Sequence, residues 1–155
     1  AYQIVSMLKG VVLRGTGRRV RAVGKPLAGK TGTTNRSMDT WFVGFSPDLA
    51  VGVFAGYDMP RPLGNRETGS SVAAPIFRDF MAAALQGKPA IPFRIPPGVR
   101  LVRIEAATGL PARPGAAGVI LEVFRDGSEP GADTAVIDGS DGIAYTGASD
   151  VGGKY

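Results

Sequence analysis

Ala28-Gly29-Lys30-Thr31-Gly32-Thr33-Thr34-Asn35 is the stretch that decides the fold of this chain, together with the two apolar runs that follow it. Trp41 to Phe45 and Leu49 to Tyr57 are rich in aromatic and β-branched residues, and Ser46-Pro47-Asp48 between them is typical of a turn. The pattern predicts an antiparallel hairpin. Because both runs are apolar on both faces, we expect helices to cover each side of the sheet.

An amphipathic helix is expected before the hairpin. Its apolar residues recur at the spacing of one helical face: Ile4, Leu8, Val11 and Val12. Gly15-Thr16-Gly17 ends this pattern. A basic stretch from Arg18 to Lys25 then leads into the Lys30–Thr33 segment, which we expect to form a strand.

A second helix is expected after the hairpin. Ser70 and Ser71 are candidate N-caps, and Pro75 is tolerated in a first helical turn. Gly87 and Pro89 are typical of its end. Its predicted apolar face comprises Ala73, Ile76, Phe77, Phe80, Met81 and Ala84. These elements together predict an α+β fold (α/β layered), an antiparallel sheet covered by helices.

The pattern changes after Pro97. Residues 99–104 alternate like a half-buried strand, Thr108-Gly109 resembles a turn, and residues 119–124 are expected to form a further short strand. Beyond Pro130 the chain is mostly Gly, Ala, Asp and Ser, so we expect it to be loosely ordered. We therefore divide the chain into a main part (1–90), a short β-rich extension (91–130) and an acidic Gly/Ala-rich tail (131–155).

The composition excludes several kinds of chemistry. The chain has 155 residues, of which 44% are hydrophobic and 20% charged, as in an ordinary globular protein. It contains no His and no Cys, which excludes a Ser-His-Asp triad, imidazole zinc sites, thiol catalysis and disulfides. We expect no metal and no cofactor. No apolar run is long enough to span a membrane.

Charge is unevenly distributed along the chain. Residues 1–36 carry eight Lys or Arg and no acid, whereas residues 122–155 carry two basic and seven acidic residues. A basic region can attract nucleic acid or other anions through its general field. No aromatic residues interleave the cluster from Arg14 to Lys25, so we do not expect nucleic-acid binding.

Residues 24–31 also match the phosphate-binding loop pattern G-x-x-x-x-G-K-[ST]. In that interpretation Lys30 reaches the terminal phosphates and Thr31 holds magnesium. Such a loop must open a helix whose N-terminus faces the phosphates. Here the residues that follow, Gly32 to Asn35, are poor helix formers and precede a strand pair. A nucleotide-binding module therefore remains an alternative that the context disfavours.

Ser6 and Lys9 match Ser-x-x-Lys, a spacing that brings a hydroxyl near an amine one helical turn away. The pattern fixes only two positions and arises easily by chance. Lys9 falls off the apolar face of the predicted helix, and no Ser or Asn occurs between Met7 and Lys30. We expect Ser6 to be a helix-surface serine and the nucleophile to be absent from this chain.

The block of residues 28–35, followed by residues 39–48 and 53–58, closely resembles the transpeptidase domain of class A penicillin-binding proteins, the bifunctional peptidoglycan synthases. The flanking segments agree: residues 8–17 resemble the helix and turn before that strand, residues 74–81 the terminal helix, and residues 122–130 the segment behind it. The resemblance implies a fold like that of serine β-lactamases and DD-peptidases, incomplete in this chain, with residues 1–90 as the C-terminal part of the domain.

The resemblance assigns roles to the Lys-Thr-Gly-Thr residues. Lys30 supplies a positive charge for the carboxylate of a donor peptide or a β-lactam. Thr31 and Thr33, two apart on a strand, project their hydroxyls to the same side. Gly32 leaves room for close backbone packing, and the Thr33 backbone N–H is implied as one oxyanion donor.

Asn35 and Asp39 are candidates for the rim of a substrate groove, with an ordinary turn role as the alternative. The implied function is cross-linking of peptidoglycan stem peptides by serine acyl transfer, with acylation by β-lactams. A β-lactamase using the same strand, or a β-rich envelope domain without chemistry, are further alternatives.

Family members carry an upstream Ser-x-x-Lys and a Ser-x-Asn element, and neither is plausibly placed here. Ala1-Tyr2-Gln3 lacks an initiator Met, so we expect the chain to begin in mid-sequence. The implied partners are stem peptides, β-lactams and the missing upstream part of the same protein. The implied location is the periplasmic face of the bacterial inner membrane, through an anchor outside this chain. We expect the isolated chain to be inactive.

Overall fold

The computed structural model describes residues 1–131. The chain divides into two compact units, Ala1–Pro96 and Pro97–Tyr155, which are considered separately below. Apart from Gly131, the tail predicted to be loosely ordered lies outside the described residues.

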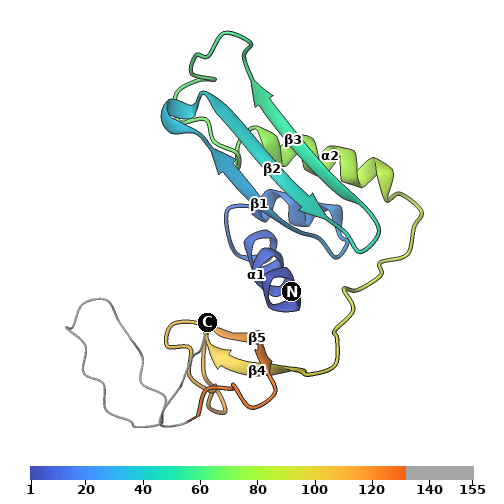
Figure 1. Ribbon diagram of the computed structural model, residues 1–155, viewed down its shortest axis with the longest axis vertical. Helices are drawn as coiled ribbons and strands as arrows, with labels where there is room; N and C mark the ends of the chain where they lie inside the picture. The colour runs from blue at the N-terminus through green and yellow to red at the C-terminus, as the bar shows by residue number, and fades with distance from the viewer. Residues whose placement is uncertain (132–155) are drawn as a thin grey trace, which may run out of the picture. The chain divides into compact units, whose positions relative to one another are not determined.

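The first unit is built on a three-stranded antiparallel sheet in the order β1-β2-β3 (Figure 1). Its strands are β1 (Ala28–Thr33), β2 (Asp39–Phe45) and β3 (Ala50–Gly56). The tight connection between β2 and β3 includes a hydrogen bond of 2.8 Å from the Ser46 N–H to the Leu49 carbonyl. The predicted hairpin and its turn are therefore confirmed.

Two α-helices and two short 3-10 helices complete this unit. They are α1 (Tyr2–Leu13), η1 (Arg18–Val23), η2 (Asn35–Ser37) and α2 (Ala73–Ala84). The end of α1 before Gly15 is confirmed. The Gly15 N–H makes the last bond of helical spacing, to the Val11 carbonyl, and the Gly17 N–H then donates to the same carbonyl, six residues back, instead of continuing the helix. The basic stretch, for which no helix was predicted, forms η1 and inserts Val20 fully into the core.

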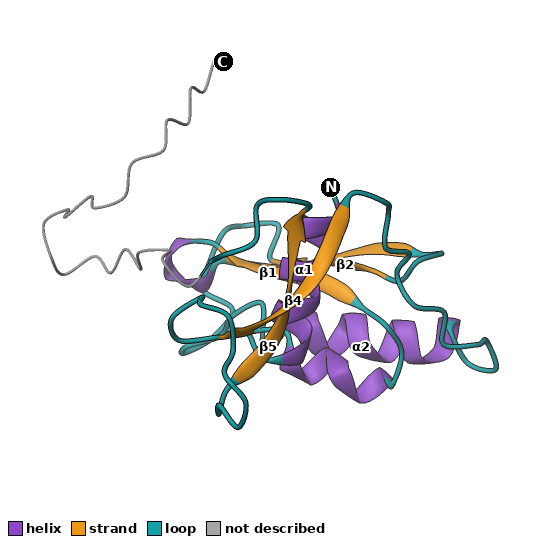
Figure 2. Ribbon diagram, turned by 90° about the horizontal axis from the view of Figure 1, so that it is seen from below, coloured by secondary structure: helices purple, strands orange, loops and turns teal. Residues whose placement is uncertain are grey.

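The core lies on one face of the sheet. Along β2, Phe42 is fully buried while its neighbours Trp41 and Val43 are 43% and 54% exposed. The Phe42 ring contacts Phe77 of α2 at 4.6 Å between centroids, and α2 runs along this face of β2 and β3 (Figures 1 and 2). The core cluster consists of Val12, Val20, Leu27, Phe42, Ala73, Ala74, Phe77, Met81 and Leu85.

The opposite face of the sheet is open. Trp41 pairs with Phe54 across β2 and β3 with ring centroids 4.7 Å apart, yet Phe54 remains 53% exposed. Within residues 1–131, the prediction of helices on both faces is thus met on one face only. The strands carry apolar side chains on each side, but Val12 of α1 and the buried residues of α2 belong to the same core.

Two details of the helix predictions are wrong. Ile4 of α1 and Ile76 and Phe80 of α2 were assigned to buried faces, but all three are about half exposed. Neither Ser70 nor Ser71 caps α2, because the N-cap residue is Val72 and makes no side-chain hydrogen bond. The Ser71 hydroxyl instead accepts from the Thr68 N–H at 2.8 Å within the preceding loop. Local loop contacts and the path of the chain therefore override the simple capping pattern.

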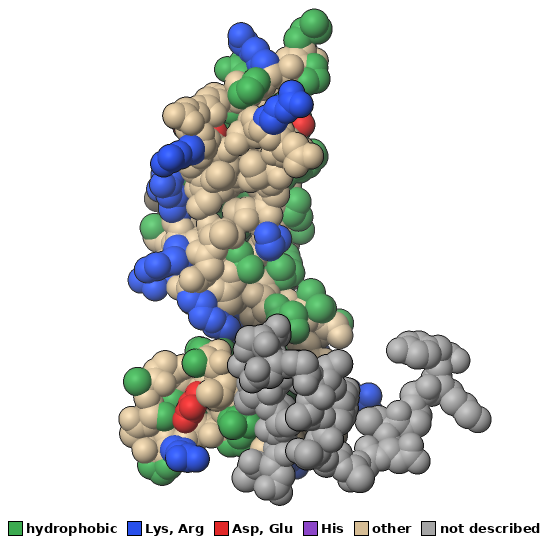
Figure 3. All heavy atoms as spheres, turned by 90° about the vertical axis from the view of Figure 1, so that its left-hand side faces the viewer, with side chains coloured by type: hydrophobic (Ala, Val, Ile, Leu, Met, Phe, Trp, Pro, Cys, Tyr) green, Lys and Arg blue, Asp and Glu red, His purple; other side chains and the backbone are tan. Residues whose placement is uncertain are grey.

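The surface of the first unit is basic and solvated. Arg18, Arg19 and Arg21 of η1 are exposed, and Lys and Arg side chains are spread over the surface between other residue types (Figure 3). On α2, a hydrogen bond of 2.7 Å from Arg78 lowers the pKa of Asp79 below its usual range. On the face that Figure 3 shows, the basic side chains are dispersed and do not form one concentrated patch.

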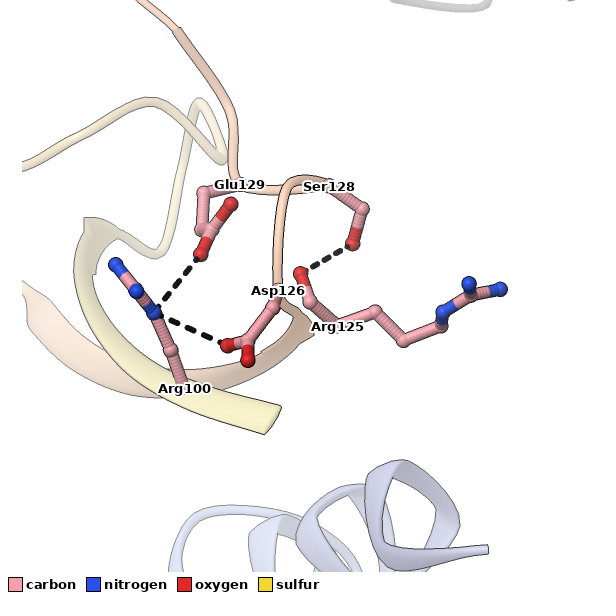
Figure 4. Close-up of polar contacts among 5 residues, drawn as sticks. All are labelled: Arg100, Arg125, Asp126, Ser128 and Glu129. Carbon is pink, nitrogen blue, oxygen red and sulfur yellow. Dashed lines mark hydrogen bonds and ion pairs between the residues drawn. The ribbon is translucent and has the colours of Figure 1, made fainter. Parts of the chain in front are cut away.

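The second unit contains an antiparallel pair, β4 (Val99–Glu105) and β5 (Val119–Arg125), so both predicted strands are confirmed. Ile104 and Val123 are its buried apolar residues. The Arg100 Nε lies 3.0 Å from Asp126 and 3.6 Å from Glu129, tying β4 to the chain behind β5 (Figure 4). The predicted turn is present, with Gly109 at φ +71° and its N–H donating to the Glu105 carbonyl.

Among the described residues, none of the helices has the length and apolarity needed to cross a membrane. Over the same part of the chain, no group of three or more acidic, His or Cys side chains is arranged to hold a metal ion.

Candidate functional site

The Lys30–Thr33 segment lies in β1, at the edge of the sheet. Within residues 1–131, β1 has β2 as its only strand neighbour. A strand edge presents a row of backbone N–H and C=O groups that are available to another chain. The strand order therefore places the candidate site residues on an edge of the sheet that, among the described residues, pairs with no further strand.

The register of the sheet fixes which backbone groups face that edge. The Thr34 N–H donates to the Asp39 carbonyl at 3.0 Å, so this residue pair bonds across the ladder. Thr33 and Thr40 form the next pair in the same register. Because hydrogen-bonded and non-hydrogen-bonded pairs alternate in an antiparallel ladder, the N–H of Thr33 points away from β2. It is thus directed outward, where a ligand can reach it.

The side chains of Thr31 and Thr33 lie on the covered face of the sheet, the same face as their cross-strand partners Phe42 and Thr40. The Thr33 hydroxyl oxygen accepts a hydrogen bond of 3.0 Å from the Gly69 N–H. The Thr31 hydroxyl lies 2.8 Å from the hydroxyl of Thr16. Each threonine of the motif is therefore held by a group from a different, sequence-distant segment.

Lys30 approaches the site from the other face of the strand. Because side chains alternate along a strand, that of Lys30 starts from the open face, which it shares with its cross-strand partner Val43. The Lys30 ammonium donates to the Thr31 carbonyl at 2.9 Å. In this register that carbonyl also points away from β2, so the ammonium lies at the free edge of β1.

Gly32 is enclosed on both sides of the sheet. On the open face, an added Cβ would lie 3.2 Å from the Cβ of Trp41. On the covered face, the loop before α2 approaches so closely that a Cβ on Gly69 would lie 2.5 Å from the carbonyl oxygens of both Gly32 and Trp41. Glycine at position 69 therefore lets its own N–H reach Thr33.

The two candidates for a groove rim lie beside the end of β1. Asn35 begins η2 and is exposed. The Asp39 N–H donates to the Thr34 hydroxyl at 2.8 Å, and that hydroxyl lies 3.4 Å from the Asp39 carboxylate. Asp39 thus has a defined turn role, and the groove role of both residues stays a prediction.

The structure does not give the phosphate-binding-loop pattern or the Ser-x-x-Lys pattern the surroundings that its chemistry requires. Residues 28–33 form a strand that pairs with β2, whereas a phosphate-binding loop would need a helix to begin after Thr31. Ser6 and Lys9 lie within α1, and both are partly exposed. The structure therefore gives the Lys30–Thr33 motif the strand setting that was predicted for it.

Sequence reasoning missed three residues around the motif: Thr16 and Gly69, which contact it, and Ser70, which contacts Thr16. Besides the contacts already described, the Ser70 hydroxyl donates to the Thr16 carbonyl at 2.7 Å. Thr16 lies 15 positions before Thr31, and Gly69 lies 36 positions after Thr33. The sequence offered only the weak signal that Gly15-Thr16-Gly17 and Thr68-Gly69-Ser70 each set a small polar residue beside glycine.

Comparison with known proteins agrees with this geometry. Residues 1–82 match the family described as penicillin binding protein transpeptidase domain. The chain is 49% identical over 124 residues to penicillin-binding protein 1A of Rickettsia conorii, covering 80% of this chain and 15% of that protein. It is 46% identical over 131 residues to penicillin-binding protein 1A of Pseudomonas aeruginosa, covering 84% of this chain and 16% of that protein.

A solved structure shows the same likeness. The crystal structure of penicillin-binding protein 1A from Haemophilus influenzae matches with a TM-score of 0.70 and 32% sequence identity, over 82% of this chain and 20% of that chain. This chain therefore belongs to the penicillin-binding protein transpeptidase family, and the predicted α+β fold and family are confirmed. It spans about 15% of the length of the curated relatives that it matches.

Proposed function

We propose that this chain forms the carboxylate-binding and oxyanion-stabilising edge of a serine-type D-Ala-D-Ala transpeptidase. The observation that carries the proposal is the outward direction of the Thr33 N–H at the free edge of β1, beside the Lys30 ammonium and two threonine hydroxyls. The family membership supplies the reaction class, cross-linking of peptidoglycan stem peptides.

In this proposal the donor peptide lies along β1. Its terminal carboxylate is bound by the hydroxyls of Thr31 and Thr33 and by the field of Lys30, since charge-assisted hydrogen bonds are the stronger kind. Gly69 already donates to the Thr33 oxygen, so the proton of the Thr33 hydroxyl is available to the carboxylate. The same contacts suit the carboxylate of a β-lactam.

The Thr33 N–H acts on the reacting carbonyl. A serine hydroxyl attacks that carbon, and negative charge develops on the oxygen, which accepts from the Thr33 N–H and from the N–H of the serine itself. Collapse of the tetrahedral intermediate breaks the peptide bond, releases the terminal D-alanine with the transferred proton, and leaves an acyl-serine. The amine of an acceptor peptide then attacks the ester, restores the serine and forms the cross-link.

The serine belongs, in this proposal, to a segment of the same protein upstream of the region described. A partly exposed Ser6 on α1 is not assigned as the nucleophile. The isolated chain is therefore expected to bind no penicillin covalently. Anchoring at the periplasmic face of the inner membrane belongs equally to a part of the protein outside this chain.

A chimera tests the proposal. The part of this chain that aligns with the Pseudomonas aeruginosa relative replaces the matching segment of that protein, and acylation by fluorescent penicillin is followed on gels. The decisive variant is Thr33→Pro, which removes the outward N–H together with the hydroxyl and leaves the hydrogen bonds to β2 intact, because proline is tolerated at a strand edge. Its acylation rate should fall by roughly 10²–10³-fold, the loss typical of one oxyanion donor.

The matched control is Thr33→Val, which keeps the N–H and removes only the hydroxyl. Its loss should be smaller, about tenfold, as expected for one hydrogen bond to a charged group. A folded chimera that is never acylated, or a Thr33→Pro variant acylated as fast as the parent chimera, would contradict the proposal. Labelling of the isolated chain at any serine would contradict the assignment of the nucleophile to another segment.

A further inference from the structure

Thr16 links three segments that are distant in sequence, since it contacts both Thr31 of β1 and Ser70. Thr16 comes from the link between α1 and η1, and its hydroxyl lies 2.8 Å from that of Thr31. Ser70 comes from the loop before α2, and its hydroxyl donates to the Thr16 carbonyl at 2.7 Å. Ser70 therefore holds the backbone of Thr16, while the side chain of Thr16 contacts the motif strand.

The direction of these hydrogen bonds decides what the chain of contacts does. A backbone N–H can only donate, so the Thr33 oxygen is an acceptor toward Gly69 and its own proton is left for a ligand. Between Thr16 and Thr31, either hydroxyl can be the donor. An ionised carboxylate only accepts hydrogen bonds, so a Thr31 hydroxyl that binds one must spend its single proton on it.

We propose that Thr16 is a positioning residue of the carboxylate site: it donates to the Thr31 oxygen and so turns the Thr31 proton toward the bound carboxylate. Thr31 then resembles Thr33, whose oxygen accepts from the Gly69 N–H. In both residues the oxygen accepts from a protein donor and the hydroxyl proton is directed at the ligand. Ser70 holds Thr16 in place through its carbonyl. This inference rests on the proposed function, because it concerns the same carboxylate.

The effect of Thr16 is expected to be moderate and to pass entirely through Thr31. In the chimera described above, Thr16→Val removes the donor at nearly constant shape. The second-order rate constant for acylation by fluorescent penicillin should fall about 3- to 10-fold, the effect of one neutral hydrogen bond. Thr16→Ser keeps the hydroxyl and should restore the rate to within about twofold of the parent.

A double-mutant cycle separates positioning from a general structural role. If Thr16 acts through Thr31, adding Thr16→Val to a Thr31→Val chimera should cause no further loss of rate. The melting temperature of each variant is measured alongside. A structural role would instead lower the melting temperature and slow acylation in both backgrounds.

The outcomes are distinct. Three results would overturn the role of Thr16 while the proposed function stands. Thr16→Val could be acylated as fast as the parent, it could lose the same rate in the Thr31→Val background as in the parent, or Thr16→Ser could fail to restore the rate. A folded parent chimera that is not acylated at all overturns the proposed function, and the role of Thr16 falls with it.

Discussion

The two faces of the three-stranded sheet are formed by alternate residues of the same strands, yet they differ in burial and in the contacts that their side chains make. On one face, Phe42 is fully buried against Phe77 and the core contributed by α1, η1 and α2. On the other, Trp41 and Phe54 touch each other but remain about half exposed. Burial on the covered face therefore stabilises this unit, whereas the open face exposes apolar side chains to solvent.

The comparison also separates the parts of the motif. Thr31 and Thr33 lie on the covered face, where residues of the core-forming segments hold their hydroxyls. Lys30 starts from the open face and reaches the edge through the Thr31 carbonyl. Contacts with distant segments thus position the two hydroxyls. The Lys30 ammonium is held by a hydrogen bond to the neighbouring Thr31 carbonyl.

The largest expected difference between the faces is seen in two neighbouring aromatic residues. Phe42→Ala should lower the free energy of unfolding by about 3–5 kcal/mol, since it opens a cavity in the core. Trp41→Ala should cost only about 1 kcal/mol, mainly the contact with Phe54. Urea unfolding of the chain followed by far-UV circular dichroism suits both variants, because Trp41 is the single tryptophan.

Similar losses for the two variants would remove the distinction between the faces. It would mean that the open face is buried in solution, by self-association or by another contact. Repeating the measurement at several protein concentrations identifies self-association, since the stability then depends on concentration.

A second test concerns the loop that packs on the covered face at β1. Gly69→Ala places a Cβ against two carbonyl oxygens, so we expect a loss of about 1–3 kcal/mol, typical of overpacking. Gly64→Ala is the control, because its Cβ meets only the flexible Glu67 side chain and should change stability by less than about 0.5 kcal/mol. Equal stabilities of the two variants would show that the loop does not hold Thr33.

The smallest effect, and one of opposite sign, is expected at Thr40. Its hydroxyl is buried and has no hydrogen-bond partner among the described residues. Thr40→Val should therefore stabilise the chain, by about 1 kcal/mol at most, because it removes an unsatisfied polar group at constant shape. The facing residue is the control: Thr33→Val should be slightly destabilising, since it loses the bond from Gly69. A less stable Thr40→Val variant would contradict this account of the covered face.

Much of the secondary structure follows from local sequence. The hairpin of β2 and β3, the end of α1 at Gly15 and the separate strands β4 and β5 were all predicted, because strand propensity and turn chemistry act over a few residues. The N-caps of α2 and the burial of Ile76 and Phe80 were predicted wrongly. The burial error arises because periodicity shows that a helix is amphipathic but not how wide its covered stripe is. The capping error arises because Ser71 bonds within the preceding loop instead.

The candidate site divides in the same way. The Lys30–Thr33 motif and the family were evident from the sequence, because a strand motif followed by its hairpin is contiguous along the chain. Thr16, Gly69 and Ser70 were not, because no local pattern links them to β1. Their contacts exist only once the loops before η1 and α2 converge on one end of the strand.

The sequence by itself thus determined the order of the elements, the edge motif and the family. These depend on side-chain type and spacing within short segments. The tertiary structure alone decided which face of the sheet is covered, which way the Thr33 N–H points and which residues stand behind the two threonine hydroxyls. The physical reason is that these features depend on strand register and on contacts between segments tens of residues apart, which local propensity does not encode.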